Sequence, residues 1–509
     1  MSQQKTIKAV SAITLVIMLS KVFGFLREAI LAAYFGTGMA ADAYAAAYGT
    51  YYIPILLFGS CISSTLIPLY IERRDNVGLN EADRLASNTL NIYVVSGVLV
   101  SAFMYLLADP IISLLYSGFD AETHALAVDL MHIMLINLAF ALGAQVLMNI
   151  LNAQKHFVAA QLTGFPLNVC SILAAVFFAR RYGVRVMAWA VAASAVMQVL
   201  IEVPVLLKSF CYRWEFSLRD PLIRRMLILA APAILSMSAT EINNIVDKSM
   251  ASNLQMGALS AMNYSFRLVT FVNGIMVVPL MTVMFSRMSE KAALKDKSGI
   301  VTLLRENTEW VTALVFPLTV IAAIASEEVI RIAFMRGAFN EESLRLTSGV
   351  FAMYILGELF FGLRDMLNRV FHAMQDTKTP MCVALFMIII NIILNILFVK
   401  LIGVNGLPLS TTVSGIIAML LLMQLLRRRL GGLGFKASVG ELARIAGAAA
   451  IAAVWCILLE RFLPHADYLM YVIMRFLFVA GGGLIVYLAA AWMLGSRNIR
   501  NIKGLLRRK

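Results

Sequence analysis

The chain has 509 residues, of which 61% are hydrophobic and only 14% are charged, and its mean hydropathy is +0.82. This composition excludes an ordinary cytosolic enzyme, because a single core could not bury so much apolar surface. The net charge of +14 would suit a nucleic-acid-binding protein only if the basic residues gathered on a water-exposed domain, and the sequence shows no such domain. We therefore predict an all-α polytopic membrane protein that binds no nucleic acid.

Apolar runs of about 20 residues, each long enough to cross a bilayer core of roughly 30 Å, predict about fourteen transmembrane helices. The first six lie near residues 9–34, 42–70, 88–116, 124–150, 159–180 and 186–207. The next six lie near 226–247, 258–286, 308–330, 346–372, 379–399 and 404–426, and the last two near 439–460 and 467–495. A polar segment between the first two groups, residues 208–225, is the best candidate for a linker.

The basic residues predict how the chain is oriented in the membrane. With an even number of spans both termini share one side, and that side holds 27 Lys and Arg residues. The other side holds nine, which are Arg180, Arg181, Arg185, Lys248, Arg331, Arg336, Arg345, Lys400 and Arg461. Because cytoplasmic loops carry the excess of positive charge, we predict that both termini are cytoplasmic.

The chain is expected to contain an internal repeat. A shift of 217 residues aligns Met39 with Met256, and a shift of 221 aligns Gln154 with Gln375. Six spans on each side of the linker give both halves the same orientation, as a parallel repeat about an axis along the membrane normal requires. Chance similarity among apolar helices is the alternative. The predicted parts are a six-helix lobe (1–207), a cytoplasmic linker (208–225), a second six-helix lobe (226–430) and two additional helices with a basic tail (431–509).

Charged residues in the first span are candidate functional residues, because charge within a membrane is expensive. This span carries Lys21, Arg27 and Glu28. Lys21 and Glu28 are seven residues apart and share a helical face, whereas Arg27 points elsewhere in a straight helix. These three residues either neutralise one another locally or form a cationic wall that faces an internal cavity.

The eighth span carries Arg267 with no acidic residue within one turn. Arg27 and Arg267 lie roughly 10 to 14 Å below the outer ends of their helices, so they could meet at one depth. A guanidinium engages two phosphate oxygens at once, which favours a cavity that receives an anion. Two other charged residues, Glu202 and Arg475, lie near span ends and are expected to extend toward the membrane interface.

Polar side chains in three later spans suggest an ion site. Asp247 lies in the seventh span, Asn391 and Asn395 lie one turn apart in the eleventh, and Thr411 lies in the twelfth. Carboxylate, amide and hydroxyl oxygens are ligands for a small hard cation such as Na⁺. Interhelical hydrogen bonds, which are common in membrane bundles, would use the same residues. The sequence favours neither interpretation.

No catalytic constellation is recognisable in the sequence. The five histidines are scattered, without a nucleophile, a metal-ligand spacing or a P-loop. We therefore predict that the protein is not an enzyme and requires no cofactor. Transport would depend on an ion gradient or on the downhill flux of the substrate.

Four segments resemble a known family. They are SKVFGFLREAILAAYFGTGMAADAY at residues 20–44, NILNAQKHFVAAQLTGFPLN from Asn149, NYSFRL around Arg267, and HAMQDTKTP from His372. These segments look like those of the MurJ (MviN) lipid II flippases, within the multidrug/oligosaccharidyl-lipid/polysaccharide exporter superfamily. The resemblance implies a multi-pass protein of the bacterial inner membrane. It would move lipid II, an undecaprenyl-pyrophosphate-linked peptidoglycan precursor, from the inner to the outer leaflet by alternating access, with the peptidoglycan synthesis machinery as a possible partner.

The resemblance also implies a substrate site. Lys21, Arg27 and Arg267 match basic positions that line a cavity for the pyrophosphate and glycan, and Glu28 and Asp42 match acidic positions of the same motif. The family's arginine in the second span has no counterpart, because residues 49–60 read GTYYIPILLFGS. This departure leaves open a flippase for another polyprenyl-linked oligosaccharide. A cation-coupled drug exporter is a further alternative, which the arginines disfavour because they would repel a cationic drug.

Two more features follow from the resemblance. The family's sodium site resembles Asp247, Asn391, Asn395 and Thr411, so Na⁺ is a candidate coupling ion. Asn395 stands where the family has a carboxylate, which predicts a weaker or lost site. The last two spans are where the family provides a groove for the lipid tail.

Overall fold

We describe a computed structural model of the chain, which covers residues 3–294, 296–464 and 468–500. Over these ranges the protein is helical, with no β-strand. Contacts divide the chain into two compact units, residues 1–260 and 261–509, which are described separately. The predicted all-α fold is confirmed.

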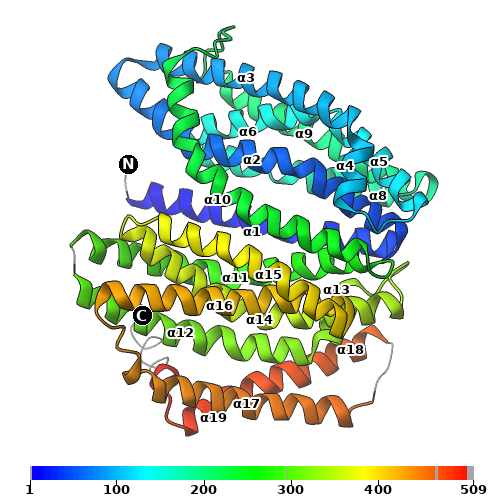
Figure 1. Ribbon diagram of the computed structural model, residues 1–509, viewed down its shortest axis with the longest axis vertical. Coiled ribbons are helices and arrows are strands. Elements are labelled where there is room, and N and C mark those ends of the chain that lie inside the picture. The colour runs from blue at the N-terminus through cyan, green and yellow to red at the C-terminus, as the bar shows by residue number, and fades with distance from the viewer. Residues whose placement is uncertain (1–2, 295, 465–467, 501–509) are drawn as a thin grey trace. The chain divides into compact units, whose positions relative to one another are not determined.

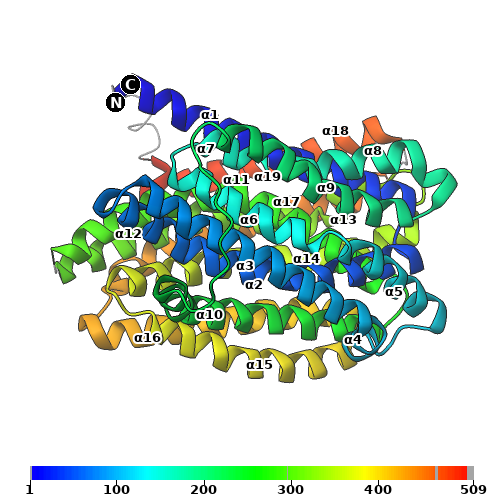
Figure 2. The same cartoon turned by 90° about the horizontal axis from the view of Figure 1, so that it is seen from above.

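The helices of the first unit include two with eight residues or fewer. They are α1 (Gln3–Phe35), α2 (Met39–Asn76), α3 (Leu79–Leu106), α4 (Ala108–Leu115), α5 (Ala121–Leu135), α6 (Leu138–Ala153), α7 (Phe157–Leu162), α8 (Phe165–Tyr182), α9 (Arg185–Leu206) and α10 (Pro221–Ser252). Helix α2 packs against α3, α5, α6 and α10. Figure 1 shows α10 beside α2, and Figure 2 shows α3 beside α2. Helix α10 therefore belongs by its contacts to the first unit.

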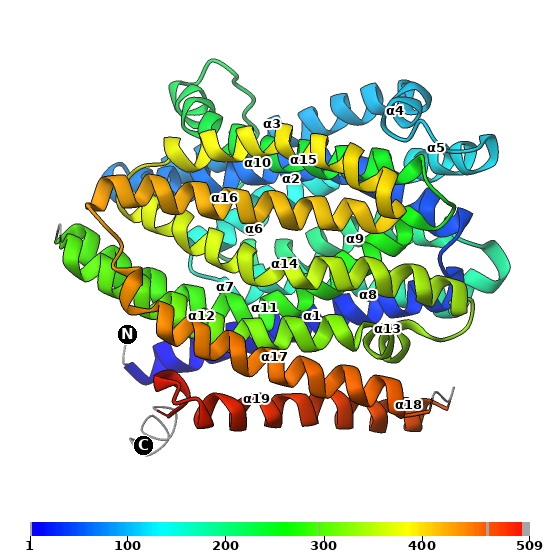
Figure 3. The same ribbon diagram turned by 60° about the horizontal axis from the view of Figure 1, so that its bottom comes forward.

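The second unit continues from α11, whose first turn lies in the first unit. Its helices are α11 (Ala258–Ala293), α12 (Lys297–Ile324), α13 (Ser326–Phe334), α14 (Glu341–Ala373), α15 (Lys378–Ile402), α16 (Gly406–Leu430), α17 (Val439–Phe462), α18 (Leu469–Phe476) and α19 (Gly482–Met493). Two 3₁₀ turns (Gly403–Asn405 and Phe435–Ala437) and one π-helical turn (Leu477–Gly481) complete it. Figure 3 shows α15, α16 and α14 in succession, and α17 beside α19.

Each of the fourteen predicted spans falls on a helix or on a helix with a short break. Within the described residues, nine helices are long and apolar enough to cross a membrane, or ten if the α5–α6 pair, bent by 50°, counts as one span. The protein is thus a multi-pass membrane protein. The count of fourteen stays a prediction, since α1, α10 and α11 fall outside this set and α15 and α16 are counted in it as one stretch, Lys378–Leu430.

The core of the second unit lies between α14, α16 and α12. Buried apolar residues of these helices pack together, among them Leu367, Phe371, Leu422 and Leu304. Because lipid tails are as apolar as these side chains, van der Waals packing between the helices holds this core together. Helix α17 packs on both α12 and α19, which attaches the two additional helices to this core.

Backbone turns repeat between the two halves of the sequence. Left-handed residues occur in pairs spaced 221, 220 and 220 residues apart, namely Gly36 with Gly257, Lys155 with Gln375, and Gly183 with Gly403. The breaks between α3 and α4 and between α12 and α13 are spaced similarly. These features support the internal repeat. The turns change the predicted alignment of Gln154 with Gln375 by one residue. Lys155, and not Gln154, has the left-handed conformation of Gln375.

The segment between α9 and α10 is fixed along α3. Residues 207–220 are not helical, and α10 starts at Pro221, so the non-helical segment is shorter than the predicted linker. Asn88 exchanges two hydrogen bonds with the backbone of Ser217, at 3.0 and 2.8 Å. Arg84 donates to both oxygens of Glu215 at 2.6 and 2.7 Å. Polar residues of α3 therefore hold this segment in one place.

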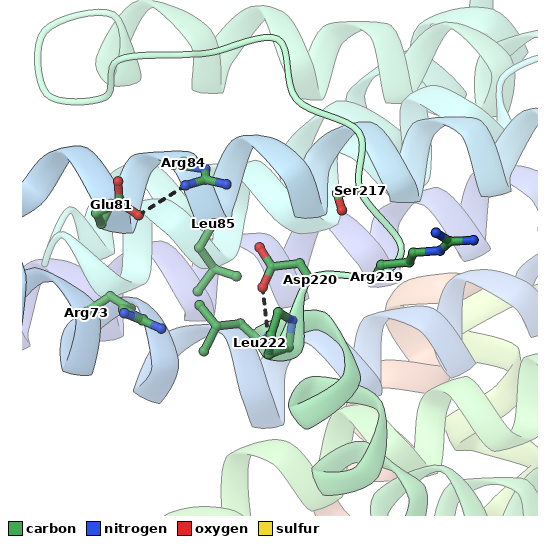
Figure 4. Close-up of a pocket in the computed structure, with 9 residues that line it drawn as sticks. Arg73, Glu81, Arg84, Leu85, Ser217, Arg219, Asp220 and Leu222 are labelled. Atoms are coloured by element: carbon green, nitrogen blue, oxygen red, sulfur yellow. Dashed lines mark hydrogen bonds and ion pairs between the residues drawn. The ribbon is translucent and has the colours of Figure 1, made fainter.

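A cavity of about 380 Å³ lies where this segment meets the end of α2 and the start of α3. Figure 4 shows the side chains that line it. Basic and acidic groups both contribute: Arg73, Arg84 and Arg219 with Glu81 and Asp220. Asp220 also accepts a hydrogen bond from Leu222 N at 2.8 Å, which caps α10.

Candidate functional site

Helix α1 carries a buried ion pair within the first unit. Arg27 is 8% exposed, and its Nη2 lies 2.5 Å from Oε1 of Glu28. The expectation that Arg27 points away from Glu28 is wrong. The two Cα positions are about 100° apart around the helix, but the long guanidinium arm reaches sideways to the next residue. The pair is thus locally neutral, while Lys21 lies half-buried two turns earlier.

Tyrosines of α2 lie beside Arg27. Tyr44 and Tyr48 are both within electrostatic reach of its guanidinium. The ring of Tyr48 stacks on Tyr44 at 6.0 Å and on Tyr52 at 5.8 Å, between ring centroids. Their spacing of four residues places the three rings along one face of α2. The stack was not predicted, although the i, i+4, i+8 spacing of Tyr44, Tyr48 and Tyr52 is visible in the sequence.

Asp42 lies at the start of α2 and is 5% exposed. Its carboxylate accepts hydrogen bonds from Gly257 N and Ser260 N, both at 2.7 Å. These are backbone donors at the start of α11, where a carboxylate also complements the helix dipole. The structure therefore gives Asp42 a capping role, and its part in substrate binding stays a prediction.

Arg267 lies on α11 in the second unit and is exposed. The adjacent Phe266 makes an edge-to-face contact with Tyr354 of α14, with ring centroids 5.9 Å apart. Further along α11, Asn273 donates a hydrogen bond to the buried carboxyl of Glu358. Helix α11 thus exposes the side chain of Arg267, while Phe266 and Asn273 contact α14.

The candidate sodium ligands of α15 and α16 form a hydrogen-bonded cluster. Asn395 donates to Asn391 Oδ1 at 3.0 Å and accepts from Ser410. Asn391 in turn approaches Thr411 and Ser414, each at 3.5 Å. The oxygens are of the type that suits Na⁺, but both amide oxygens already accept a hydrogen bond from a neighbour. Asp247 lies in the first unit, buried, with Asn243 3.5 Å from Oδ2. These contacts fit interhelical hydrogen bonding, and a role of the same residues in sodium binding stays a prediction.

Two charged residues do not extend to the interface as expected. Arg475 is 7% exposed and pairs with Glu328 of α13 and with Glu460 of α17. Glu202 of α9 is fully buried, and neither of its carboxyl oxygens has a hydrogen-bond partner among the described residues. Both expectations were wrong because distance from a helix end does not tell what neighbouring helices cover.

Comparison with known proteins decides the family. The family model for "Lipid II flippase MurJ" matches residues 31–478. This chain belongs to the MurJ lipid II flippase family. It is 30% identical over 464 residues to the probable lipid II flippase MurJ of Synechocystis sp., covering 86% of this chain and 84% of that protein. It is 29% identical over 429 residues to the lipid II flippase MurJ of Burkholderia cenocepacia, covering 81% and 82%.

Solved structures show the same fold. A lipid II flippase MurJ in an inward closed conformation matches with a TM-score of 0.79 at 23% identity, covering 94% of this chain and 98% of that one. An inward-facing MATE family multidrug transporter of the MOP superfamily matches with a TM-score of 0.70 at 14% identity, covering 84% and 98%. The predicted family is confirmed, and the predicted superfamily stays a prediction.

Proposed function

We propose that this chain translocates lipid II from the inner to the outer leaflet of the bacterial cytoplasmic membrane. The observation that carries the proposal is the buried guanidinium of Arg27 on α1, beside Glu28 and two tyrosines. Because charge within a membrane is expensive, a buried ionisable residue is a candidate functional group. A guanidinium suits a pyrophosphate, because its donors replace the water that the anion loses on entry. Family membership supports lipid II as the substrate.

Alternating access is the proposed mechanism. The anionic headgroup enters from the cytoplasmic side, binds to cationic residues that include Lys21, Arg27 and Arg267, and leaves on the other side. The polyprenyl tail stays in lipid, and the apolar α17 and α19 offer a surface for it. The protein catalyses no chemical reaction in this proposal, and both termini are cytoplasmic, since most basic residues lie on that side.

Sodium coupling is a separate part of the proposal. Asp247, Asn391, Asn395 and Thr411 would provide oxygens for Na⁺ if the ion displaced the hydrogen bonds within the α15–α16 cluster. Transport in the presence of a sodium gradient, compared with a potassium gradient, tests this part. Equal rates would remove sodium from the mechanism and leave the headgroup site untouched. Contact with peptidoglycan synthesis enzymes is a further expectation, tested by co-purification from membranes.

The deciding experiment is translocation of fluorescent lipid II in proteoliposomes that contain the full chain. We expect lipid II to become accessible to an added reagent on the opposite leaflet. A matched liposome sample with an undecaprenyl-pyrophosphate carrying a different oligosaccharide measures specificity. If the second substrate were translocated and lipid II were not, lipid II would be rejected as the substrate. The protein would then be a flippase for another lipid-linked oligosaccharide.

A further inference from the structure

A buried cluster of two glutamates and one arginine joins three helices of the second unit. Glu328 lies on α13, Glu460 lies near the end of α17, and Arg475 lies on α18, which Figure 3 shows beside α13. Nη1 of Arg475 pairs with Oε1 of Glu328, and Nη2 lies 2.5 Å from Oε2 of Glu460. The side chains of Arg475, Glu328 and Glu460 are 6%, 3% and 21% exposed. One cation therefore meets two carboxyl groups inside the protein.

Each glutamate of the cluster has one oxygen that the arginine does not use. Oε2 of Glu328 and Oε1 of Glu460 are buried, and neither has a hydrogen-bond partner among the described residues. The two carboxyl groups lie within hydrogen-bonding reach of each other. Two ionised carboxylates offer only acceptors, so neither can satisfy the other. One added proton would make one carboxyl group a donor and the other its acceptor.

The net charge of the cluster also favours a bound proton. With both carboxyl groups ionised, the cluster carries one negative charge that Arg475 does not balance. A buried charge without a partner is expensive, and two like charges that share a buried site disfavour each other's ionisation. With one proton bound, the remaining carboxylate balances the guanidinium, and the cluster is neutral.

The neighbouring described residues do not compensate this negative charge. On α13, Arg331 pairs with Glu327 at 3.1 Å and with Glu341 of α14 at 2.8 Å, so its guanidinium is already engaged. Glu327 adds a second negative charge within electrostatic reach of Glu460. Arg461, the next residue of α17, is exposed. The surroundings therefore increase the demand for a positive charge between the two carboxyl groups.

A proton fits this place better than a metal ion does. Within the part of the chain that the structure describes, no group of three or more His, Cys, Asp or Glu side chains could hold a metal ion. Cys456 lies one turn before Glu460, and its thiol donates to Val479 O at 3.4 Å. His465 and Asp467, between α17 and α18, lie outside the described residues and are tested below by substitution.

We propose that Glu328 and Glu460 bind one proton between them, and that this proton joins α17 to α13 beside the ion pairs of Arg475. The proton resides on one carboxyl group and is donated as a hydrogen bond to the other. Because α17 also packs on α19, the attachment of the two additional helices to α13 depends on pH. None of these residues belongs to the proposed headgroup site, so this role is independent of the transported substrate.

The first experiment measures the melting temperature of the purified full chain in detergent as a function of pH. A proton that the folded chain retains above the unfolded carboxyl pKa of about 4.3 stabilises the protein, and this stabilisation is lost as pH rises. Glu460→Gln replaces the proton with an amide hydrogen and should remove this part of the pH dependence. Relative to wild type, its melting temperature should rise by a few degrees between about pH 5 and about pH 9.

The second experiment detects the proton directly. The infrared spectrum of the folded wild type at neutral pH should contain the carbonyl band of a protonated carboxyl group that both Glu328→Gln and Glu460→Gln lack. The control variants should keep this band and the wild-type pH dependence. They are Glu342→Gln, at an exposed glutamate of α14, His465→Gln and Asp467→Asn.

The stability of the variants separates a shared proton from a fully ionised cluster. Each single Gln variant leaves one carboxylate for Arg475 and should melt near the wild type at neutral pH. The double variant leaves Arg475 without an anion and should melt much lower. If neither single variant folded, both carboxylates would be required in their charged form, and the proposal would be overturned. If only one folded, that variant would decide by both measurements.

Two further results would contradict the shared proton. A difference spectrum without the band of a protonated carboxyl group would mean that both glutamates are ionised, with a metal ion or water between them. A pH dependence that is the same in the wild type and in Glu460→Gln would mean that the proton does not hold the helices together. Either result would overturn the proposal and leave lipid II translocation to be judged by its own experiment.

Discussion

Arg27 and Arg475 are two buried arginines with opposite surroundings. Their exposed fractions are nearly equal, 8% and 7%. Arg27 has one carboxylate, from the next residue of its own helix, and tyrosines beside it. Arg475 has two carboxylates, Glu328 and Glu460, which come from two other helices. Burial alone therefore does not identify a functional arginine, whereas the origin and number of its partners separate a binding group from a group that joins helices.

The largest expected effect concerns the helix-joining arginine. Arg475→Ala leaves the buried carboxyl group of Glu328 and the partly buried one of Glu460 without their cation, and should lower the free energy of unfolding by about 3–5 kcal/mol. Thermal unfolding in detergent measures this loss. Arg461→Ala, at an exposed arginine of the same region, should change stability little. If Arg475→Ala melted like the wild type but failed to transport, Arg475 would be a functional residue and not one that joins helices.

Arg27→Gln should affect transport rather than stability. Loss of a charge-assisted contact to the headgroup is expected to slow lipid II translocation by about 10- to 100-fold. The melting temperature should change little, since the neutral amide can still donate a hydrogen bond to the carboxylate of Glu28. Translocation in proteoliposomes provides the measurement, with Arg180→Gln as an exposed control on α8. A normal rate for Arg27→Gln would remove this residue from the site.

Glu28→Gln should strengthen anion binding. The substitution removes the carboxylate that competes with the substrate for Arg27, so affinity for a polyprenyl pyrophosphate is expected to rise about threefold. Titration of the purified protein measures it. A fall in affinity would mean that Glu28 orients the guanidinium and that its charge is required.

The smallest effect concerns the exposed pair between Arg84 and Glu215. Hydrogen bonds from Arg84 hold the pKa of Glu215 below its usual range. The pair therefore adds stability above the unfolded carboxyl pKa of about 4.3, and this contribution is lost as pH falls through the lower folded value. Hydrogen exchange of residues 209–217 should rise on acidification, and Glu215→Gln should show the faster exchange already at neutral pH. An exchange rate independent of both changes would assign the docking to the other polar residues of α3, among them Asp83, Ser87 and Asn88.

Sequence patterns predicted the helical layout because hydrophobic length is a local property. Each predicted span coincides with a helix or an interrupted helix. Breaks such as that at Leu107 were not predicted, since they depend on packing against neighbours.

The partners of charged residues were beyond sequence reasoning. Lys248 was counted as a loop residue that sets orientation, and only the fold reveals its approach to Gly49. Residues 208–225 were predicted only as a polar linker, and the sequence did not show that Asn88 and Asn91 of α3 bind the backbone of this segment. Contacts between residues more than 100 positions apart leave no local pattern that a single sequence could show.

The left-handed pair Lys155 and Gln375 has a consequence for the history of the chain. A non-glycine residue in this conformation is strained by roughly 1–2 kcal/mol, and both halves retain it although the two side chains differ. Such a shared backbone irregularity is a trace of duplication of an ancestral half, retained after the side chains diverged. The few identical residues align the two halves poorly, whereas the positions of the left-handed turns still show which residues correspond.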